Sequence, residues 1–189
     1  MAILSPGPNV ERRRGAETGV EWVQSIEGDE IWKLVDNGTI SQAAFDAALA
    51  AVPHGEGNVR ESKDATLFLF QYSDGLLGAV FMLPGFCRGT SIALKLKGQQ
   101  DWLSTRFDEQ PEPAHPHFAW LLKGIERMIH TGTPSYPVER TLLTAGILDR
   151  ALTSRIQNYE KLMTPELRVK YQPADYPYAP YPPLNSPPS

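Results

Sequence analysis

The sequence predicts an α+β fold: a two-layer sandwich with an open-faced, largely antiparallel β-sheet and helices packed on one face. Two apolar runs, 64–72 and 76–83, are joined by the turn signal Ser73-Asp74-Gly75, which is typical of a β-hairpin. In 90–97 apolar residues alternate with Ala and Lys, as in a strand exposed on one side. Two later segments have helical periodicity and would cover one face of the sheet.

The N-terminal part of the chain combines a loop with a segment that has two alternative structures. Residues 1–16, rich in Pro, Gly and Arg, are expected to form an entry loop. In 17–27 three apolar residues recur at intervals of three, which favours a helix over a strand. The internal Gly19 disfavours a helix by about 1 kcal/mol, and a strand over 20–26 is the alternative. The three apolar residues are Val20, Val23 and Ile26.

The next stretch predicts a helix between two less regular segments. Residues 29–35 form a short helix or a strand that ends at the turn Asp36-Asn37-Gly38. Ser41 is suited to cap a helix N-terminus, and the alanine-rich segment 43–51 strongly favours a helix. The polar residues 53–63 are expected to form a loop.

The C-terminal half is predicted to add a fourth strand at 101–107 and the two amphipathic helices, 117–129 and 137–155. The alternation in 167–171 indicates a short edge strand. The tail 173–189 repeats Tyr and Pro. Because proline donates no backbone hydrogen bond, we expect this tail to be extended and to stay out of a sheet interior.

Length and composition restrict the class of protein. The 189 residues suit one domain, 17–172, between the entry loop and the tail, and 41% hydrophobic residues suffice for a core. A net charge of -4 and a pI of about 5.6 disfavour a nucleic-acid binder. No secretory signal and no apolar run of about 18 residues is found, so no membrane association is expected. The single cysteine, Cys87, favours a reducing, cytoplasmic location.

Charged residues near the N-terminus are candidates for a site. Glu17 and Glu21 are four residues apart, so their carboxylates would point to the same side of a helix. Such a pair is suited to bind a substrate, with Glu21 as the candidate acid/base group; the alternative is a solvated helix face. Arg14, in the run Arg12-Arg13-Arg14, is suited to bind a phosphate or carboxylate. Solvation, or pairing with Glu11 and Glu17, is the alternative.

Motifs for metals and dinucleotides are incomplete. His115-Pro116-His117 has the look of a metal-ligand pair, but no third ligand stands at a suitable spacing, so no metal is expected. His117 is more simply the start of a helix. Gly55-Glu56-Gly57 follows no strand and lacks the third glycine of a dinucleotide fingerprint. No cofactor is therefore expected to bind this chain alone.

The segment 117–155 contains a helix, the turn Thr131-Gly132-Thr133-Pro134 and a second helix that ends in Thr153-Ser154-Arg155. Such a turn needs the freedom of glycine and a proline that cannot extend the first helix. This arrangement resembles the closing module of the Gfo/Idh/MocA oxidoreductases. The resemblance implies that 17–172 is the C-terminal α/β domain of that family, whose open-faced sheet carries much of the substrate site and the oligomer interface.

A shorter match lies at Glu17-Thr18-Gly19-Val20-Glu21. Members of the family often carry Asp-x-Gly-x-His on the first helix of this domain, with Asp and His facing the sugar. The resemblance implies that Glu17 and Glu21 bind substrate, with Arg14 and His117 as further candidates. A Glu in place of the His acts as a base only where its pocket raises its pKa.

The family's N-terminal Rossmann domain, which binds NAD or NADP, has no counterpart among these 189 residues. The first hypothesis is the substrate-binding and oligomerisation half of a nicotinamide-dependent oxidoreductase for a sugar or polyol-like alcohol, not competent for hydride transfer alone. It implies a homo-oligomer through the open sheet face, with the chain either a fragment of the enzyme or one half of a split enzyme that pairs with a separate Rossmann-domain subunit. The second hypothesis is a stand-alone dimeric module that binds a sugar or a protein without catalysis. The third is a lyase or epimerase that uses the two glutamates without a nicotinamide.

Overall fold

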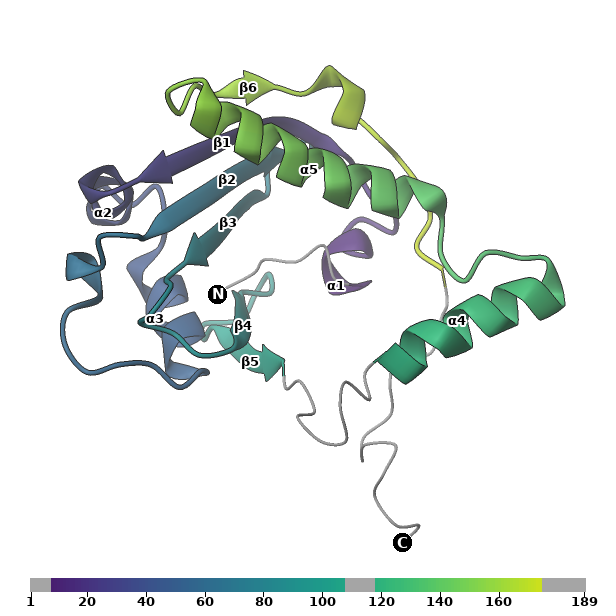
Figure 1. Cartoon of the computed structure of the whole chain (residues 1–189), viewed down its shortest axis with the longest axis horizontal. Coiled ribbons are helices and arrows are strands. Elements are labelled where there is room, and N and C mark those ends of the chain that lie inside the picture. Colours follow the sequence, from purple (N-terminus) through teal and green to yellow (C-terminus); the bar gives the residue numbers. More distant parts are fainter. Residues whose placement is uncertain (1–7, 108–117, 175–189) are drawn as a thin grey trace, which may run out of the picture.

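The computed structural model of the chain describes residues 8–107 and 118–174, and it confirms an α+β fold with an open antiparallel sheet (Figure 1). The main sheet has the strand order β3-β2-β1-β6, and a second sheet pairs β4 with β5. The strands are β1 Val20–Glu27, β2 Thr66–Tyr72, β3 Leu77–Met82, β4 Thr90–Leu94, β5 Leu103–Phe107 and β6 Leu162–Met163. The helices are α1 Pro8–Glu11, α2 Asp29–Asp36, α3 Gln42–Ala50, α4 Phe118–Thr131 and α5 Val138–Ile156, with 3-10 turns at Val59–Glu61 and Pro165–Leu167.

The segment predicted as a helix over 17–27 forms the strand β1, so that prediction is wrong and the alternative strand is confirmed. The pairing of β1 with β2 shifts between Val20 and Trp22, which marks a β-bulge at Glu21. The bulge brings Val20 and Val23 into the same core, although they are three residues apart. A spacing of three is normal for a helix, and here a bulged strand produces it.

Helix α5 covers one face of the main sheet, as Figure 1 shows. The backbone N–H of Ser25 donates to Ser154 Oγ at 2.9 Å, and Ser25 Oγ donates to the carbonyl of Ala151 at 2.5 Å. These bonds hold α5 against β1 at Ser25. Strand β6 pairs only with Trp22 and Val23, so Ser25 lies further along β1 than that pairing. The apolar core of this face consists chiefly of Val20, Val23, Phe70, Tyr72, Leu143, Ile147 and Leu167.

The opposite face of the sheet is covered in part by α2 and α3. Trp32 of α2, Phe45 of α3 and Phe81 of β3 pack against one another with ring centroids between 4.8 and 6.4 Å apart. Rings in such contact bury large apolar areas and stabilise the core on this side. Ser41 caps α3 as predicted, because its Oγ accepts a hydrogen bond from the N–H of Ala44 at 3.3 Å.

Helix α4 lies apart from the main sheet (Figure 1), so of the two late helices only α5 covers it. Most of the apolar residues described in α4 are exposed, and α5 carries a second apolar stripe on the side away from the sheet. Exposed apolar surfaces of this kind are common at interaction sites. The exposed residues are Phe118, Leu121, Leu122, Ile125, Met128 and Ile129 of α4, and Val138, Leu142, Leu148, Leu152 and Ile156 of α5.

Both ends of the described chain differ in detail from the prediction. The entry loop 1–16 contains the short helix α1, in which Glu11 is buried. The edge strand expected at 167–171 is wrong, because β6 pairs with β1 a few residues earlier. Leu167 packs instead into the core, so close to Gly146 of α5 that a Cβ there would lie 2.3 Å from Leu167 Cδ2. The tail 173–189 is described only as far as residue 174.

Candidate functional site

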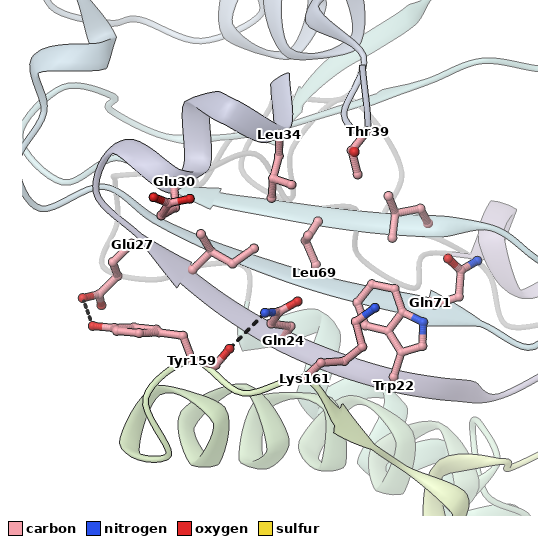
Figure 2. Close-up of a pocket in the computed structure, with 12 residues that line it drawn as sticks. Trp22, Gln24, Glu27, Glu30, Leu34, Thr39, Leu69, Gln71, Tyr159 and Lys161 are labelled. Carbon is pink, nitrogen blue, oxygen red and sulfur yellow. Dashed lines mark hydrogen bonds between the residues drawn. The ribbon is translucent and has the colours of Figure 1, made fainter. Parts of the chain in front are cut away.

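A groove of about 450 Å³ lies on the open face of the main sheet, between α2 and the loop that leads from α5 to β6 (Figure 2). Its floor is formed by Trp22 and Gln24 of β1 and by Leu69 and Gln71 of β2. Successive residues of a strand point to opposite faces, so this floor is separate from the face that α5 buries. A groove of this size suits a small-molecule ligand. The remaining lining residues are Ile26, Glu27, Glu30, Leu34, Thr39, Leu77, Tyr159 and Lys161.

The wall opposite α2 is a loop with a strained backbone. Asn158 and Tyr159 have φ angles of 54° and 64°, a left-handed conformation that costs a residue such as Tyr about 1–3 kcal/mol. Two hydrogen bonds to the end of α5 support the loop. The N–H of Tyr159 donates to the carbonyl of Ser154 at 2.7 Å, and Ser154 Oγ donates to the carbonyl of Glu160 at 2.6 Å. The loop thereby holds both Tyr159 and Lys161 at the groove.

Tyr159 is fixed at both ends, as Figure 2 shows. Gln24 Nε2 donates to its carbonyl at 2.9 Å, and its hydroxyl donates to Glu27 Oε2 at 2.6 Å. The hydrogen bond to Glu27 raises the pKa of the Tyr159 phenol above its usual value. Glu27 Oε1 lies 2.5 Å from Arg155 Nε and accepts from Thr66 Oγ1 at 3.3 Å. Glu27 therefore supports the wall through contacts of both its oxygens.

Two polar side chains of the groove are open to a ligand. Lys161 Nζ lies 4.2 Å from the centroid of the Trp22 ring, a cation–π contact that holds the ammonium over the floor. Gln71 stands opposite Trp22 in the strand pairing, and within the described residues its amide has no hydrogen-bond partner. An amide offers two donors and an acceptor, and an ammonium offers three donors. The groove therefore combines an aromatic surface with unused hydrogen-bonding groups.

The two predicted glutamates do not line this groove. Glu17 is 1% exposed, and its Oε1 accepts from the N–H groups of Thr18 and Gly19 at 2.7 and 2.9 Å. It therefore closes the turn that leads into β1. Glu21 is half-buried in the bulge of β1, so the prediction that the two carboxylates share a helix face is wrong. Contact of either residue with a substrate stays a prediction.

The predicted basic residues also lie outside the groove. The side chain of Arg14 is 68% exposed, and its Nε is 3.5 Å from Asp74 Oδ2. The adjacent Arg13 is largely buried and binds the same carboxylate at 2.8 Å, so this arginine run is paired within the protein. His117 lies outside the described residues, as does His115, and the role of His117 stays a prediction.

A buried polar cluster ties α1, α5 and the C-terminal segment together behind the sheet. Arg140 Nε of α5 lies 2.9 Å from Glu11 Oε1 of α1. Burial raises the pKa of the Glu11 carboxyl above its usual value, with Arg140 acting against burial and Glu17 adding to it. Burial also raises the pKa values of the Tyr72 and Tyr171 phenols. These contacts join three segments and do not open into the groove.

Sequence reasoning missed the residues that form the groove. Read with a period of two, 20–27 would have placed Trp22, Gln24 and Ile26 on one side of a strand. This alternation of two was present in the sequence, but the spacing of three between Val20, Val23 and Ile26 favoured a helix. Lys161 carried no signal, because it reaches the groove through a loop whose contact with Gln24 spans 135 residues.

Comparison with known proteins gives no relative: no protein-family model, no curated protein and no solved structure matches the chain. Among the described residues, no group of three or more His, Cys, Asp or Glu side chains is placed to hold a metal ion. No helix in residues 8–107 and 118–174 combines the length and the apolar character needed to cross a membrane. The groove is therefore the feature from which a function is inferred.

Proposed function

We propose that the chain is the substrate-binding and oligomerisation half of a nicotinamide-dependent oxidoreductase of the Gfo/Idh/MocA kind. In this proposal the groove over β1 and β2 binds a sugar or polyol-like alcohol. The observation that carries it is the Trp22 ring beside the polar groups of Gln71 and Lys161. Hydroxyl groups need donors and acceptors, whereas the C–H faces of a sugar pack on an aromatic surface.

The strained loop supports a binding role for the same groove. Left-handed non-glycine residues persist only where their surroundings fix them, and they concentrate at ligand sites. Within the described lining, Glu27 is engaged by three groups and Glu30 pairs with Lys33. In this proposal the groove residues orient the alcohol and shield it from water, and hydride transfer needs the dinucleotide-binding half of the enzyme.

The described residues do not fit NAD or NADP. A Rossmann-type site is built on a parallel β-α-β unit with a glycine-rich turn, whereas every described strand pair is antiparallel. We therefore propose that a Rossmann domain outside these residues carries the dinucleotide, either on the same polypeptide or on a separate subunit. The single cysteine, Cys87, is a free thiol and suits a reducing cytoplasmic compartment.

The exposed apolar surface of α4 and of the outer side of α5 is our candidate for the subunit interface. The sequence placed that interface on the open sheet face, but the groove occupies part of that face. Apolar residues at this density are typical of the core of an interface. The same surface favours a second candidate function, a stand-alone dimeric sugar-binding module, because two copies can cover it without another protein.

Calorimetric titration of the full chain with D-glucose, D-galactose and myo-inositol tests the site. We expect Gln71→Ala and Lys161→Ala each to weaken binding about tenfold, since each removes hydrogen bonds worth about 1–2 kcal/mol. Lys170→Ala is the matched control, because Lys170 is exposed and does not line the groove. Equal affinities in all variants would place the ligand elsewhere. Binding of NADH by the chain alone would contradict the assignment of the dinucleotide to a domain outside these residues.

A further inference from the structure

A second groove lies next to the first, along the edge strand β3 of the main sheet. It has a volume of about 380 Å³ and lies among β3, the start of α3, α1 and β4. Thr39 and Leu77 line both grooves, so the two grooves are neighbours. Figure 2 shows Thr39 at the border of the first groove.

The two grooves differ sharply in chemistry. The second is lined mainly by apolar side chains, and the two leucines at its border, Leu76 and Leu96, are 36% and 49% exposed. Of its cations, Arg13 is bound to Asp74, and Lys95 Nζ lies 5.9 Å from the centroid of the Trp102 ring. An apolar hollow open to water is unfavourable unless a ligand fills it. The main apolar lining residues are Ile40, Ala44, Leu76, Ala79, Leu94 and Trp102.

We propose that the ligand of this protein is amphiphilic, with a hydroxylated head in the first groove and an alkyl or aryl arm in the second. The arm passes between Thr39 and Leu77, the two residues common to both grooves. The inference of a hydroxylated head rests on the proposed function, whereas the inference of an apolar arm rests on the volume and lining of the second groove. The substrate class is therefore a glycoside or polyol with an apolar substituent. A free sugar would leave the second groove unfilled, and a sugar phosphate would bring a charge to an apolar lining.

Titration of the full chain with methyl β-glucoside, hexyl β-glucoside and 1-hexanol distinguishes binding of the hydroxylated head from binding of the apolar arm. One fully buried methylene tightens binding about fourfold, so partial burial of the five added methylenes should give hexyl β-glucoside at least about a 30-fold advantage over methyl β-glucoside. 1-Hexanol reports on the second groove alone, and methyl β-glucoside reports on the first.

Two neighbouring alanines of α3 give a matched pair of variants. Ala44 lines the second groove, whereas Ala43 is exposed on the same helix and does not line it. Ala44→Phe should fill the second groove, remove most of the advantage of the hexyl chain and leave methyl β-glucoside unaffected. Ala43→Phe should change neither. Leu96→Ser, at an exposed position on the border, provides a second variant and should reduce the advantage severalfold if Ala44→Phe fails to fold.

The possible outcomes test the proposed sugar site in the first groove and the proposed arm in the second groove separately. Equal affinity for the methyl and hexyl glucosides overturns the arm and leaves the head site standing; occupation of the second groove by another segment of the chain would give this result. Binding of hexyl glucoside and 1-hexanol without methyl glucoside overturns the sugar site and supports the apolar groove. A hexyl advantage that survives Ala44→Phe in folded protein overturns the proposed position of the arm. Failure of all three probes to bind overturns both proposals.

Discussion

The guanidinium of Arg13 binds both carboxylate oxygens of Asp74, with Nε to Oδ2 at 2.8 Å and Nη2 to Oδ1 at 2.9 Å. It also donates to the carbonyl of Val10 at 2.6 Å and to Thr18 Oγ1 at 2.8 Å, and its Cζ lies 4.2 Å from the centroid of the Tyr72 ring. Burial acts to raise the pKa of Asp74, but the hydrogen bonds and charge of Arg13 outweigh it and hold that pKa below its usual value. One side chain therefore joins the entry segment to the β2–β3 turn.

Arg13→Ala should lower the free energy of unfolding by about 2–4 kcal/mol, because it leaves the largely buried Asp74 carboxylate without its main partner. Arg14→Ala is the control, since Arg14 is exposed and contacts Asp74 only at 3.5 Å; we expect a change of at most about 0.5 kcal/mol. Urea denaturation measures both. Similar losses in the two variants would contradict the assignment of Arg13 as the anchor.

Gly19→Ala should destabilise the protein more than Gly15→Ala does. Both glycines have a left-handed φ, 81° and 80°, which costs an alanine about 1–2 kcal/mol. A Cβ at Gly19 would also lie 2.7 Å from the carbonyl oxygen of Leu167, whereas nothing lies within 4 Å at Gly15. Thermal and urea unfolding of both variants measure the loss of stability, and the difference between them is the cost of the steric clash with Leu167. Equal losses of stability would show that the C-terminal segment moves aside freely.

The contribution of Glu11 to the stability of the protein should fall as pH rises above about 4.5, the usual pKa of its carboxyl. Its pKa is higher in the folded state, so folding favours the protonated form. The contribution is complete below the unfolded pKa and is lost as pH passes the folded one. Urea denaturation at a series of pH values should show this slope, and Glu11→Gln should flatten it. If the pH dependence of stability were unchanged in Glu11→Gln, another titrating group would be responsible for it.

Ser154→Ala should cost about 1–3 kcal/mol of stability, because the buried N–H of Ser25 loses its acceptor and the carbonyl of Glu160 loses its donor. Hydrogen exchange should accelerate at the Ser25 amide and at the Tyr159 amide, which belongs to the same loop support. Thr153→Ala, one position earlier on α5, is the control and should leave both amides protected. Retained protection in Ser154→Ala would show that the loop keeps its conformation without this hydroxyl.

Local patterns predicted those elements whose partners are close in sequence. The hairpin of β2 and β3 follows from two apolar runs around Ser73-Asp74-Gly75, and the cap at Ser41 follows from its side-chain chemistry. The strand β1 was only the alternative to a helix, because its bulge gives two valines of one core a helical spacing. Periodicity also found the apolar face of α4 but could not tell what that face contacts.

The groove was beyond sequence reasoning for a related reason. Its floor comes from two strands and its wall from a loop after α5, so its members are brought together only by tertiary structure. The strained backbone at Tyr159 has no signature in residue type, since neither Asn158 nor Tyr159 is a glycine. Glu17 illustrates the converse: an acidic residue in a motif-like pattern serves backbone hydrogen bonds.

The packing of the C-terminal segment against β1 has a consequence for the order in which the protein is made. Thr164 donates through its N–H to the carbonyl of Glu21 and through its Oγ1 to the carbonyl of Val20, and the N–H of Glu17 donates to the carbonyl of Tyr171. Strand β1 is therefore synthesised long before the C-terminal residues that hydrogen-bond to its edge. A nascent chain stopped ahead of β6 keeps that border bare and lacks one wall of the groove, so the groove is complete only after the residues of β6 have been synthesised.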